Sequence, residues 1–305
     1  MPNVYDKVTI LRKPDWLKIN LRHSEKYVAT AQIVERNGLH TICSSGKCPN
    51  QAECWERGTA TMMILGDICT RACRFCATAS GKPLPPEESE PQRIADSVKL
   101  MGLRHAVLTS VTRDDLADGG AEHWRRVVEA VKAINHTTTV EVLIPDFDAK
   151  PELIDIVLAS KPDIVGHNIE TVERLTPSVR SRAKYRTSLA TIRHIAESGA
   201  VAKSGLMVGL GESDEEVLTT LDDLREAGCR IVTIGQYLRP TLKHLPVERY
   251  VTPAKFAEYA RAAREKGFEF VASGPLVRSS YLAEQFFTQQ KAEQKAESEG
   301  ANDNK

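Results

Sequence analysis

The chain has 305 residues, enough for one large domain or two smaller ones, and its composition is that of an ordinary globular protein. It contains 41 acidic and 41 basic residues, so net charge gives no general attraction for nucleic acid or an anionic membrane. Its apolar runs, such as TMMIL and GLMVGL, are far shorter than the roughly 18 residues that a membrane span needs. The start of the chain has neither an apolar signal segment nor the acid-poor composition of a transit peptide. We expect a cytoplasmic protein with no nucleic-acid or membrane partner.

Residues 1–55 follow no regular strand or helix pattern and are expected to form an irregular, partly helical extension. This extension contains a first cysteine group, Cys43, Cys48 and Cys54, with the spacing CxxxxCxxxxxC. Disulfides are disfavoured because a chain of this length without a signal segment is expected in a reducing compartment. Clustered cysteines in such proteins often bind zinc, so a zinc site completed by His40 remains an alternative for this group.

From about residue 59 onward, strand-like apolar runs alternate with helical patterns. In the helical stretches apolar residues recur at three- and four-residue spacing, as at Ile94, Val98 and Met101. Repeated strand-helix units with continuous apolar strands indicate a parallel sheet, and six units are too few for a closed eight-fold barrel. The sequence predicts an α/β fold, a partial, open (β/α)6 TIM-like barrel. Strands are expected at 59–66, 105–111, 138–146, 163–170, 201–210 and 230–238, with a possible seventh at 268–274. Helices are expected near 91–101, 122–135, 150–160, 187–199, 213–228 and 253–266.

A second cysteine group follows the first expected strand directly. Cys69, Cys73 and Cys76 have the spacing CxxxCxxC within the segment CTRACRFC. A 4Fe-4S cube needs four ligands, so three nearby thiolates can hold such a cluster with one iron left open for chemistry. Zinc is the weaker reading here, because zinc prefers paired CxxC half-sites. The remaining cysteine, Cys229, stands alone between a helical and a strand pattern and is expected to be a small buried hydrophobe.

Polar residues follow the other expected strands. Since the chemistry of such barrels lies at the carboxyl ends of the strands, these side chains are expected to converge on one cavity. Each also has a plain structural explanation, because strand ends are commonly polar and Asp114 and Asp115 can cap a helix. The residues in question are Thr109, Ser110, Arg113, Asp114, Asp115, Asn168, Glu170, Gly209 to Glu212, Gln236 and Tyr237.

The chain is thus expected to have three parts. Residues 1–55 form the cysteine-bearing extension, residues 56–275 form the barrel, and residues 276–305 form a short C-terminal segment. From about Lys291 the sequence is polar and low in apolar residues, which predicts a disordered tail without function.

The CxxxCxxC motif, with the aromatic Phe75 before its last cysteine, resembles the radical S-adenosylmethionine superfamily. From about residue 37 to residue 282 the chain is also similar to the lipoyl synthase family of that superfamily. It departs from that family at SRAKY, residues 181–185, where a proline-glycine turn more often precedes the matching tyrosine; this leaves Arg182 and Tyr185 without an assigned role. The similar segments are the first cysteine group, WERGTATMMILGDICTRACRFC, TSVTRDDLADGGAEHW, VGLGE, QYLRPTLKHLPVERYV and GPLVRSSY.

The resemblance implies two 4Fe-4S clusters and S-adenosylmethionine as cofactors. One cluster would chelate the amino and carboxylate groups of S-adenosylmethionine at its open iron and, once reduced, split it into methionine and a 5'-deoxyadenosyl radical. The second cluster would be consumed to supply sulfur. The implied ligands are Cys69, Cys73 and Cys76 for the first cluster, and Cys43, Cys48, Cys54 and Ser279 for the second, with catalytic roles for Cys69, Cys73, Cys76 and Ser279.

The resemblance also suggests which residues contact S-adenosylmethionine. Phe75 is expected beside the adenine, and Thr109 and Ser110 are expected at the methionyl end. Asn168 and Glu170 are candidates for the remaining polar groups of the ligand.

As in the family, the substrate would be an octanoyl chain in amide linkage to a lysine of a lipoyl carrier domain. The chain would be a sulfurtransferase of lipoate biosynthesis that inserts sulfur at carbons six and eight. The expected partners are the acyltransferase subunit of a 2-oxoacid dehydrogenase, the glycine cleavage H protein, and an electron donor such as flavodoxin or ferredoxin. Burying about six methylenes gains roughly 5 kcal/mol, so carrier contacts must supply the remaining specificity. The alternatives are another two-cluster sulfur-inserting radical enzyme, acting for instance on a tRNA base, and a zinc-stabilised scaffold without activity.

Overall fold

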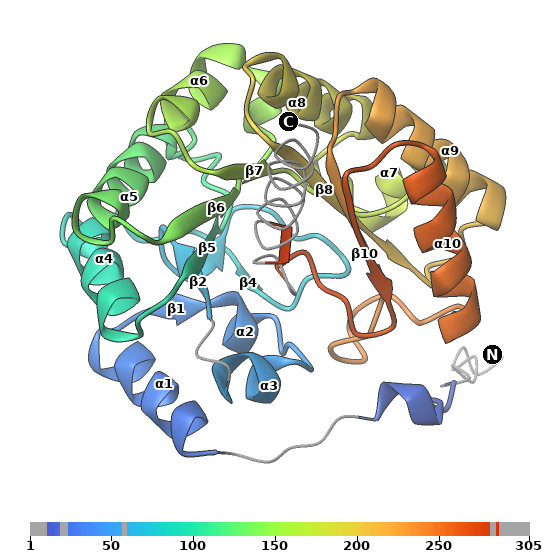
Figure 1. Ribbon diagram of the computed structural model, residues 1–305, viewed down its shortest axis with the longest axis horizontal. Helices are drawn as coiled ribbons and strands as arrows, with labels where there is room; N and C mark the ends of the chain where they lie inside the picture. The colour runs from blue at the N-terminus through green and yellow to red at the C-terminus, as the bar shows by residue number, and fades with distance from the viewer. Residues whose placement is uncertain (1–10, 19–23, 57–59, 281–284, 287–305) are drawn as a thin grey trace, which may run out of the picture.

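A computed structural model of the chain describes residues 11–18, 24–56, 60–280 and 285–286. In this part of the chain an eight-stranded sheet curves into a partial barrel with helices around its outer face (Figure 1). The strands are β1 (His40–Thr41), β2 (Thr61–Ile64), β5 (His105–Ser110), β6 (Thr139–Leu143), β7 (Ile164–Gly166), β8 (Ala202–Val208), β9 (Ile231–Gln236) and β10 (Phe270–Gly274).

The strand order in the sheet follows the chain, β1-β2-β5-β6-β7-β8-β9-β10. Strands β2 to β10 pair in parallel, and β1 adds to β2 in the antiparallel sense. Among the described residues β1 and β10 are the two edges of the sheet, so the barrel is open. The expected α/β partial barrel is confirmed, and the possible seventh strand is present as β10.

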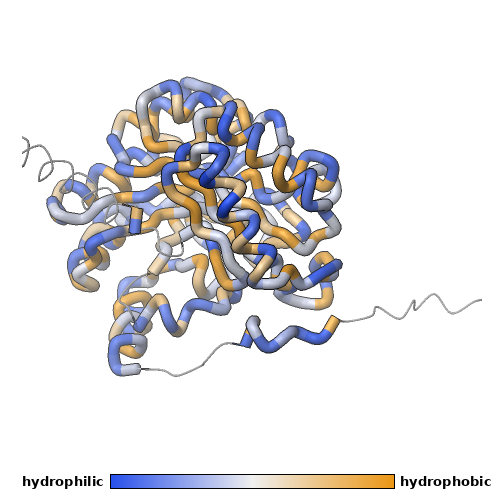
Figure 2. The backbone as a smooth tube through the Cα atoms, turned by 45° about the vertical axis from the view of Figure 1, so that its right-hand side comes forward, coloured by the Kyte–Doolittle hydropathy of each residue, from blue (hydrophilic) through white to orange (hydrophobic). Residues whose placement is uncertain are grey.

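The helices surround the sheet because each has one apolar face. In α5 (Ala121–Ile134), for example, Trp124, Val127 and Val131 are fully buried, whereas Arg125 and Glu129 pair on the outer face at 2.7 Å. Figure 2 shows hydrophobic segments in the strands and alternating colours along the helices. The other barrel helices are α4 (Glu90–Leu100), α6 (Pro151–Ala159), α7 (Thr176–Val179), α8 (Tyr185–Glu197), α9 (Asp214–Glu226) and α10 (Pro253–Glu265).

The expected helix at 213–228 shows why its start was readable from the sequence. The Ser213 hydroxyl accepts the Glu216 N–H at 3.2 Å, and the Glu216 carboxylate accepts the Ser213 N–H at 2.8 Å, which completes a capping box before α9. The expected strand at 163–170 is shorter in the structure: β7 ends at Gly166, and Glu170, whose backbone is left-handed (φ 68°), meets β8 again only through an isolated bridge to Leu206.

The N-terminal extension is partly helical, as expected. It contains α1 (Glu25–Arg36), α2 (Ile42–Ser45) and α3 (Gln51–Glu56), and its strand β1 joins the barrel sheet. The rings of Tyr27 and Trp55 lie 5.3 Å apart between α1 and α3, and the Thr30 hydroxyl donates to the Trp55 carbonyl. The extension is therefore packed on the first strand of the barrel.

The C-terminal segment returns across the interior of the barrel. Gly235 of β9 allows this crossing, because a Cβ atom there would lie 2.2 Å from the Val277 carbonyl oxygen. The Asn50 side-chain amide donates to the Leu276 carbonyl at 2.6 Å, and the Thr61 hydroxyl donates to that of Ser280 at 2.9 Å. The extension, the first strand and the C-terminal segment thus meet at one place.

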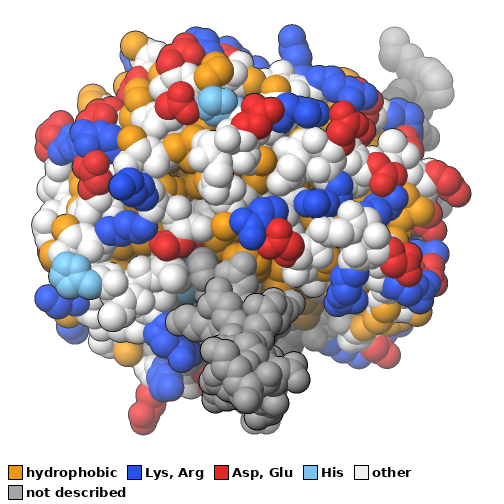
Figure 3. All heavy atoms as spheres, turned by 45° about the horizontal axis from the view of Figure 1, so that its top comes forward, with side chains coloured by type: hydrophobic (Ala, Val, Ile, Leu, Met, Phe, Trp, Pro, Cys, Tyr) orange, Lys and Arg blue, Asp and Glu red, His pale blue; other side chains and the backbone are white. Residues whose placement is uncertain are grey.

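Acidic and basic side chains are interspersed on the face shown in Figure 3, in keeping with the equal charge counts. None of the described helices combines the length and the apolar character that crossing a membrane requires. The tail from Lys291, predicted to be disordered, lies outside the described residues.

Candidate active site

A cavity of about 640 Å³ occupies the interior of the partial barrel, where the carboxyl ends of β5 and β9 meet the two cysteine segments. The structure places every residue predicted to bind a cluster or S-adenosylmethionine in its wall. These residues are Cys43, Cys48, Cys54, Cys69, Cys73, Phe75, Cys76, Thr109, Ser110, Asn168, Glu170 and Ser279.

The CxxxCxxC loop begins at Cys69, the last residue of the short strand β3 (Ile68–Cys69), which pairs with β4 (Ala79–Ser80). The backbone N–H groups of Arg71 and Thr112 point at the Cys69 sulfur, at 3.4 and 3.3 Å. Such donors stabilise a thiolate. Burial raises the pKa of the Cys76 thiol, so Cys76 favours its protonated form. Binding of a metal cation would displace this proton and convert Cys76 to a thiolate.

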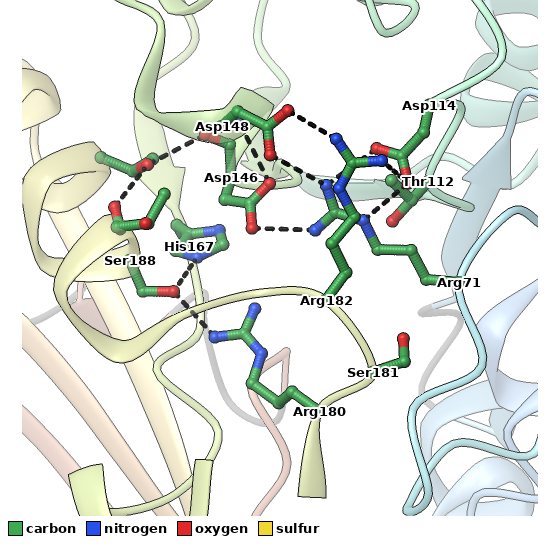
Figure 4. Close-up of polar contacts among 12 residues, drawn as sticks. Arg71, Thr112, Asp114, Asp146, Asp148, His167, Arg180, Ser181, Arg182 and Ser188 are labelled. Carbon is green, nitrogen blue, oxygen red and sulfur yellow. Dashed lines mark hydrogen bonds and ion pairs between the residues drawn. The ribbon is translucent and has the colours of Figure 1, made fainter. Parts of the chain in front are cut away.

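Arg71 fixes this loop to two neighbouring strand ends (Figure 4). Its guanidinium donates to both carboxylate oxygens of Asp114, at 2.9 and 2.8 Å, and to Asp146 at 2.8 Å. Arg71 is only 8% exposed and Asp146 only 1%. Burial acts to raise the pKa of Asp146, but the hydrogen bond and charge of Arg71 outweigh it and lower that pKa to about 2. Both carboxylates therefore remain ionised around the buried arginine.

Replacing Arg71 by methionine is expected to destabilise the fold by about 3–5 kcal/mol, because it leaves the buried Asp146 carboxylate without its partner. Chemical denaturation at pH 7 measures this loss. Arg125→Met is the control, since Arg125 forms its ion pairs on the surface of α5 and such pairs contribute little. Equal stability of wild type and Arg71→Met would contradict a structural role for this ion pair.

The same pair predicts a pH dependence. The pKa of Asp146 is about 2 in the folded chain and 3.8 ordinarily, so its contribution to stability is complete above about pH 4 and is lost as the pH falls towards 2. The free energy of unfolding of the wild type should therefore decline over this window. Arg71→Met should lack this part of the decline, because Asp146 no longer gains from being ionised.

The residues after β7 form a polar wall of the cavity. The Glu170 N–H donates to the Gly205 carbonyl and its own carbonyl accepts from the Met207 N–H, so pairing with β8 holds Glu170 in its left-handed conformation. Burial raises the pKa of the Glu170 carboxyl, against the opposing charge of Arg180. Within the described chain the Asn168 Oδ1 and Ser110 Oγ atoms are buried without a hydrogen-bond partner. A polar ligand in the cavity would satisfy both atoms, so the wall fits S-adenosylmethionine.

The first cysteine group faces the same cavity from the extension. Cys43 lies on α2, Cys54 on α3 and Cys48 in the loop between them, where its N–H donates to the Cys43 carbonyl at 3.0 Å. Arg278 and Ser279 approach from the C-terminal segment and line the cavity too. The three cysteines and the C-terminal segment thus line the same cavity, and the Asn50 bond to the Leu276 carbonyl joins their two segments.

The donor geometry bears on the zinc alternative. All seven cysteines are free thiols, and no three His, Cys, Asp or Glu side chains among the described residues lie close enough to hold one metal ion. A cube differs in that each thiolate binds a different iron, so its ligands lie farther apart than around a single ion. His40, the proposed fourth zinc ligand, pairs with Met63 in the sheet and is not among the cavity-lining residues.

The remaining predicted polar residues divide into two sets. Gln236 and Tyr237 line the cavity, as expected. Asp115, expected as a possible helix cap, instead pairs with Arg113 through two bonds of 2.9 Å. The Glu212 carboxylate accepts the N–H groups of Gly209 and Leu210, so it supports the loop after β8.

Other residues of the site were not anticipated. His167 lines the cavity and contacts the Ile144 carbonyl at 3.0 Å and the Ser188 hydroxyl at 2.9 Å; burial lowers its pKa to about 4, so it is neutral. The Arg180 guanidinium donates to the same Ser188 hydroxyl at 2.7 Å. His167 is the residue after Gly166 of β7, and that position at a strand end is the signal that could have identified it.

Comparison with known proteins places this geometry in a family. The model of the Radical SAM superfamily matches residues 63–224. A lipoyl synthase of Bacteroides fragilis (strain YCH46) is 58% identical over 274 residues, 90% of this chain and 95% of that protein. One of Treponema denticola is 55% identical over 90% of this chain and 94% of that protein.

Solved structures agree on the fold. Methylornithine synthase (PylB) has a TM-score of 0.52 at 12% identity and covers 85% of this chain and 81% of its own. HydG, a maturase of the [FeFe]-hydrogenase, has a TM-score of 0.56 at 16% identity, and the match covers 70% of this chain and 51% of HydG. The matched cysteine motif, the barrel and the identity over nine tenths of the sequence lead to one conclusion: the chain belongs to the lipoyl synthase family of the radical SAM superfamily.

Proposed function

We propose that this chain inserts two sulfur atoms, at carbons six and eight, into an octanoyl chain attached to a lysine of a lipoyl carrier domain. The observation that supports this most is that two separate cysteine triads and Ser279 line one cavity. Hydrogen abstraction and sulfur transfer must occur at the same carbon atoms. A single cavity with a radical source and a sulfur source in its wall meets that requirement.

In this proposal Cys69, Cys73 and Cys76 hold the radical-generating cluster. When bound, the cluster and S-adenosylmethionine supply a 5'-deoxyadenosyl radical. The chain's own residues bind and orient: Ser110 Oγ and Asn168 Oδ1 satisfy polar groups of the ligand, because both are otherwise buried without partners in the described chain. The other proposed contacts are Thr109 near the end of β5, Glu170 after β7, and Phe75, which packs with Tyr237 and Leu210 in an apolar cluster beside the cavity.

The second cluster is the sulfur-donating substrate, held by Cys43, Cys48, Cys54 and Ser279. Asn50, between two of these cysteines, anchors the C-terminal segment through its bond to the Leu276 carbonyl. The Thr61 bond to Ser280 anchors the residue next to Ser279. These two contacts hold Ser279 at the wall that contains the three thiols.

The apolar part of the cavity suits the octanoyl chain. Met63, Val107, Leu143 and Leu206 contribute to its lining. Each methylene buried there gains about 0.8 kcal/mol, which positions the chain without giving strong affinity. The carrier is an octanoylated acyltransferase subunit of a 2-oxoacid dehydrogenase or the glycine cleavage H protein. The electron that reduces the cluster comes from a flavodoxin or ferredoxin. Within the chain, residues 1–55 form the cysteine-bearing extension, residues 56–275 the barrel and residues 276–305 the C-terminal segment.

Ser279 offers a prediction specific to the sulfur donor. An oxygen ligand is harder than a thiolate and suits iron-sulfur chemistry less well, so its iron should be the most easily released. Ser279→Cys is expected to keep a four-iron cluster but to lose most sulfur insertion, measured as lipoyl product per chain. Ser198→Cys is the matched control, since it makes the same exchange at the end of α8, where the Ser198 hydroxyl donates to the Ile195 carbonyl away from the cavity. Near-normal lipoyl formation by Ser279→Cys would refute the labile-ligand role.

Metal content separates the proposal from a zinc scaffold. Anaerobically purified protein should be brown, with broad visible absorption and about eight irons per chain, as two cubes require. A colourless protein that contains zinc would exclude the radical mechanism. If eight irons are present and a tRNA base rather than an octanoyl group is thiolated, the other class of sulfur-inserting enzyme would be correct.

A further inference from the structure

The segment Ser178–Arg182, which we call the strap, runs from α7 towards α8 and lies against the CxxxCxxC loop. Three hydrogen bonds join the two segments. The Arg74 N–H donates to the Val179 carbonyl at 2.9 Å, the Arg74 guanidinium to the Ser178 carbonyl at 3.1 Å, and the Ala72 N–H to the Ser181 hydroxyl at 3.1 Å. The strap therefore contacts the cysteine loop on both sides of Cys73, at Ala72 and at Arg74.

Ser181 also reaches a proposed cluster ligand. Its hydroxyl oxygen lies 3.7 Å from the Cys73 sulfur, within the range of a hydrogen bond to sulfur. Because the oxygen accepts the Ala72 N–H, its own proton remains available to donate. A thiolate bound to iron has no proton, so in the loaded protein the direction of this bond is from Ser181 to Cys73.

The residue after Ser181 holds the strap in this position. Arg182 pairs with Asp148 at 3.0 Å and lies 3.7 Å from Asp114 (Figure 4). Asp114 is also the bidentate partner of Arg71 in the cysteine loop. The strap and the cysteine loop thus share one carboxylate, which links the two segments beside the contact between Ser181 and Cys73. Tyr185, by contrast, donates to Asp223 at 2.7 Å and is structural.

We propose that Ser181 is a positioning residue that tunes the radical-generating cluster: its hydroxyl donates a hydrogen bond to the Cys73 thiolate and raises the reduction potential of that cluster. The reduced cluster has one more negative charge, so a donor at its sulfur stabilises the reduced state more than the oxidised state. The inference rests on the proposed assignment of Cys73 as a ligand. It concerns the SRAKY segment, at which this chain departs from the family pattern.

The test is a redox titration of the full-length, two-cluster protein, followed by paramagnetic resonance. The signal to follow is the one that changes when S-adenosylmethionine is added. Ser181→Ala should lower the ratio of reduced to oxidised cluster at a fixed potential by up to about tenfold, a shift of about 59 mV for one electron. Ser181→Thr keeps the hydroxyl and should restore the wild-type potential. Ser178→Ala is the control, because the Ser178 hydroxyl donates to the Leu175 carbonyl and not to a cysteine.

If the reduction potential of the cluster is the same in Ser181→Ala as in wild type, the proposal is wrong, whether or not the variant is less stable. Ser181 would then be only a structural contact of Ala72. A second measurement does not depend on how well the variant folds or binds its cluster. In wild type, the paramagnetic resonance of the reduced cluster should show coupling to an exchangeable hydroxyl proton that disappears in heavy water. A wild-type protein without this coupling would also overturn the proposal. If wild-type protein binds no cluster that responds to S-adenosylmethionine, the proposed function itself fails, which is a distinguishable result.

Discussion

Cys73→Ala is expected to abolish both the cleavage of S-adenosylmethionine and the formation of lipoyl product. A cube that has lost one of three thiolates no longer holds the open iron in place. Cys73 has no core-packing role that would confuse the result, since it is partly exposed in the cavity wall. The measurement is 5'-deoxyadenosine formed per chain under reducing, anaerobic conditions.

Cys229→Ala is the matched control for loss of a thiol. Cys229 is fully buried, its sulfur contacts the Ile231 carbonyl at 3.2 Å, and burial raises its pKa to about 12, so it behaves as a core residue. This variant should keep its iron and its product. Wild-type 5'-deoxyadenosine formation by Cys73→Ala would remove the basis for the ligand assignment.

Replacing Cys43, Cys48 and Cys54 together by alanine is expected to separate the two clusters. Radical formation depends on the other triad, so some 5'-deoxyadenosine should still form. Sulfur has no source in this variant, so no thiolated product should appear, and iron should fall from about eight to about four per chain. Product and 5'-deoxyadenosine are measured in the same reaction by mass spectrometry.

The triple variant has a structural control of its own. Cys43 is buried, so its replacement removes some packing as well as a ligand. Thermal unfolding compared with Cys229→Ala shows whether the extension is still folded. Lipoyl product from a folded triple variant would mean that the sulfur comes from elsewhere.

The barrel could be predicted because its signals are local. Each of the seven parallel strands is a short apolar run bounded by helical periodicity, and β10 was readable at 268–274 for the same reason. The convergence of Thr109, Asn168 and Gln236 on one cavity followed from parallel topology alone. The ends of elements were less predictable, as at Glu170, where pairing with β8 stabilises a conformation that sequence propensity does not favour.

The contacts that support the site could not be predicted, because they join residues far apart in the sequence. Arg71 pairs with Asp146, 75 residues away, and Ser181 reaches Cys73 across 108 residues. No periodicity or spacing specifies such partners. Asp114 was visible as a polar residue at a strand end, but only the fold shows that it receives two arginines rather than capping a helix.

The most direct test of sulfur insertion by this chain is the anaerobic conversion of an octanoyl-lysine peptide, with S-adenosylmethionine and a reductant, followed by mass spectrometry. The expected product has gained two sulfur atoms at carbons six and eight, and the cluster on Cys43, Cys48 and Cys54 is consumed as it forms. The contrary result is a protein that carries both clusters and forms abundant 5'-deoxyadenosine but adds no sulfur to the octanoyl group. If this held both for the peptide and for an octanoylated intact carrier domain, the proposed sulfur insertion would be wrong.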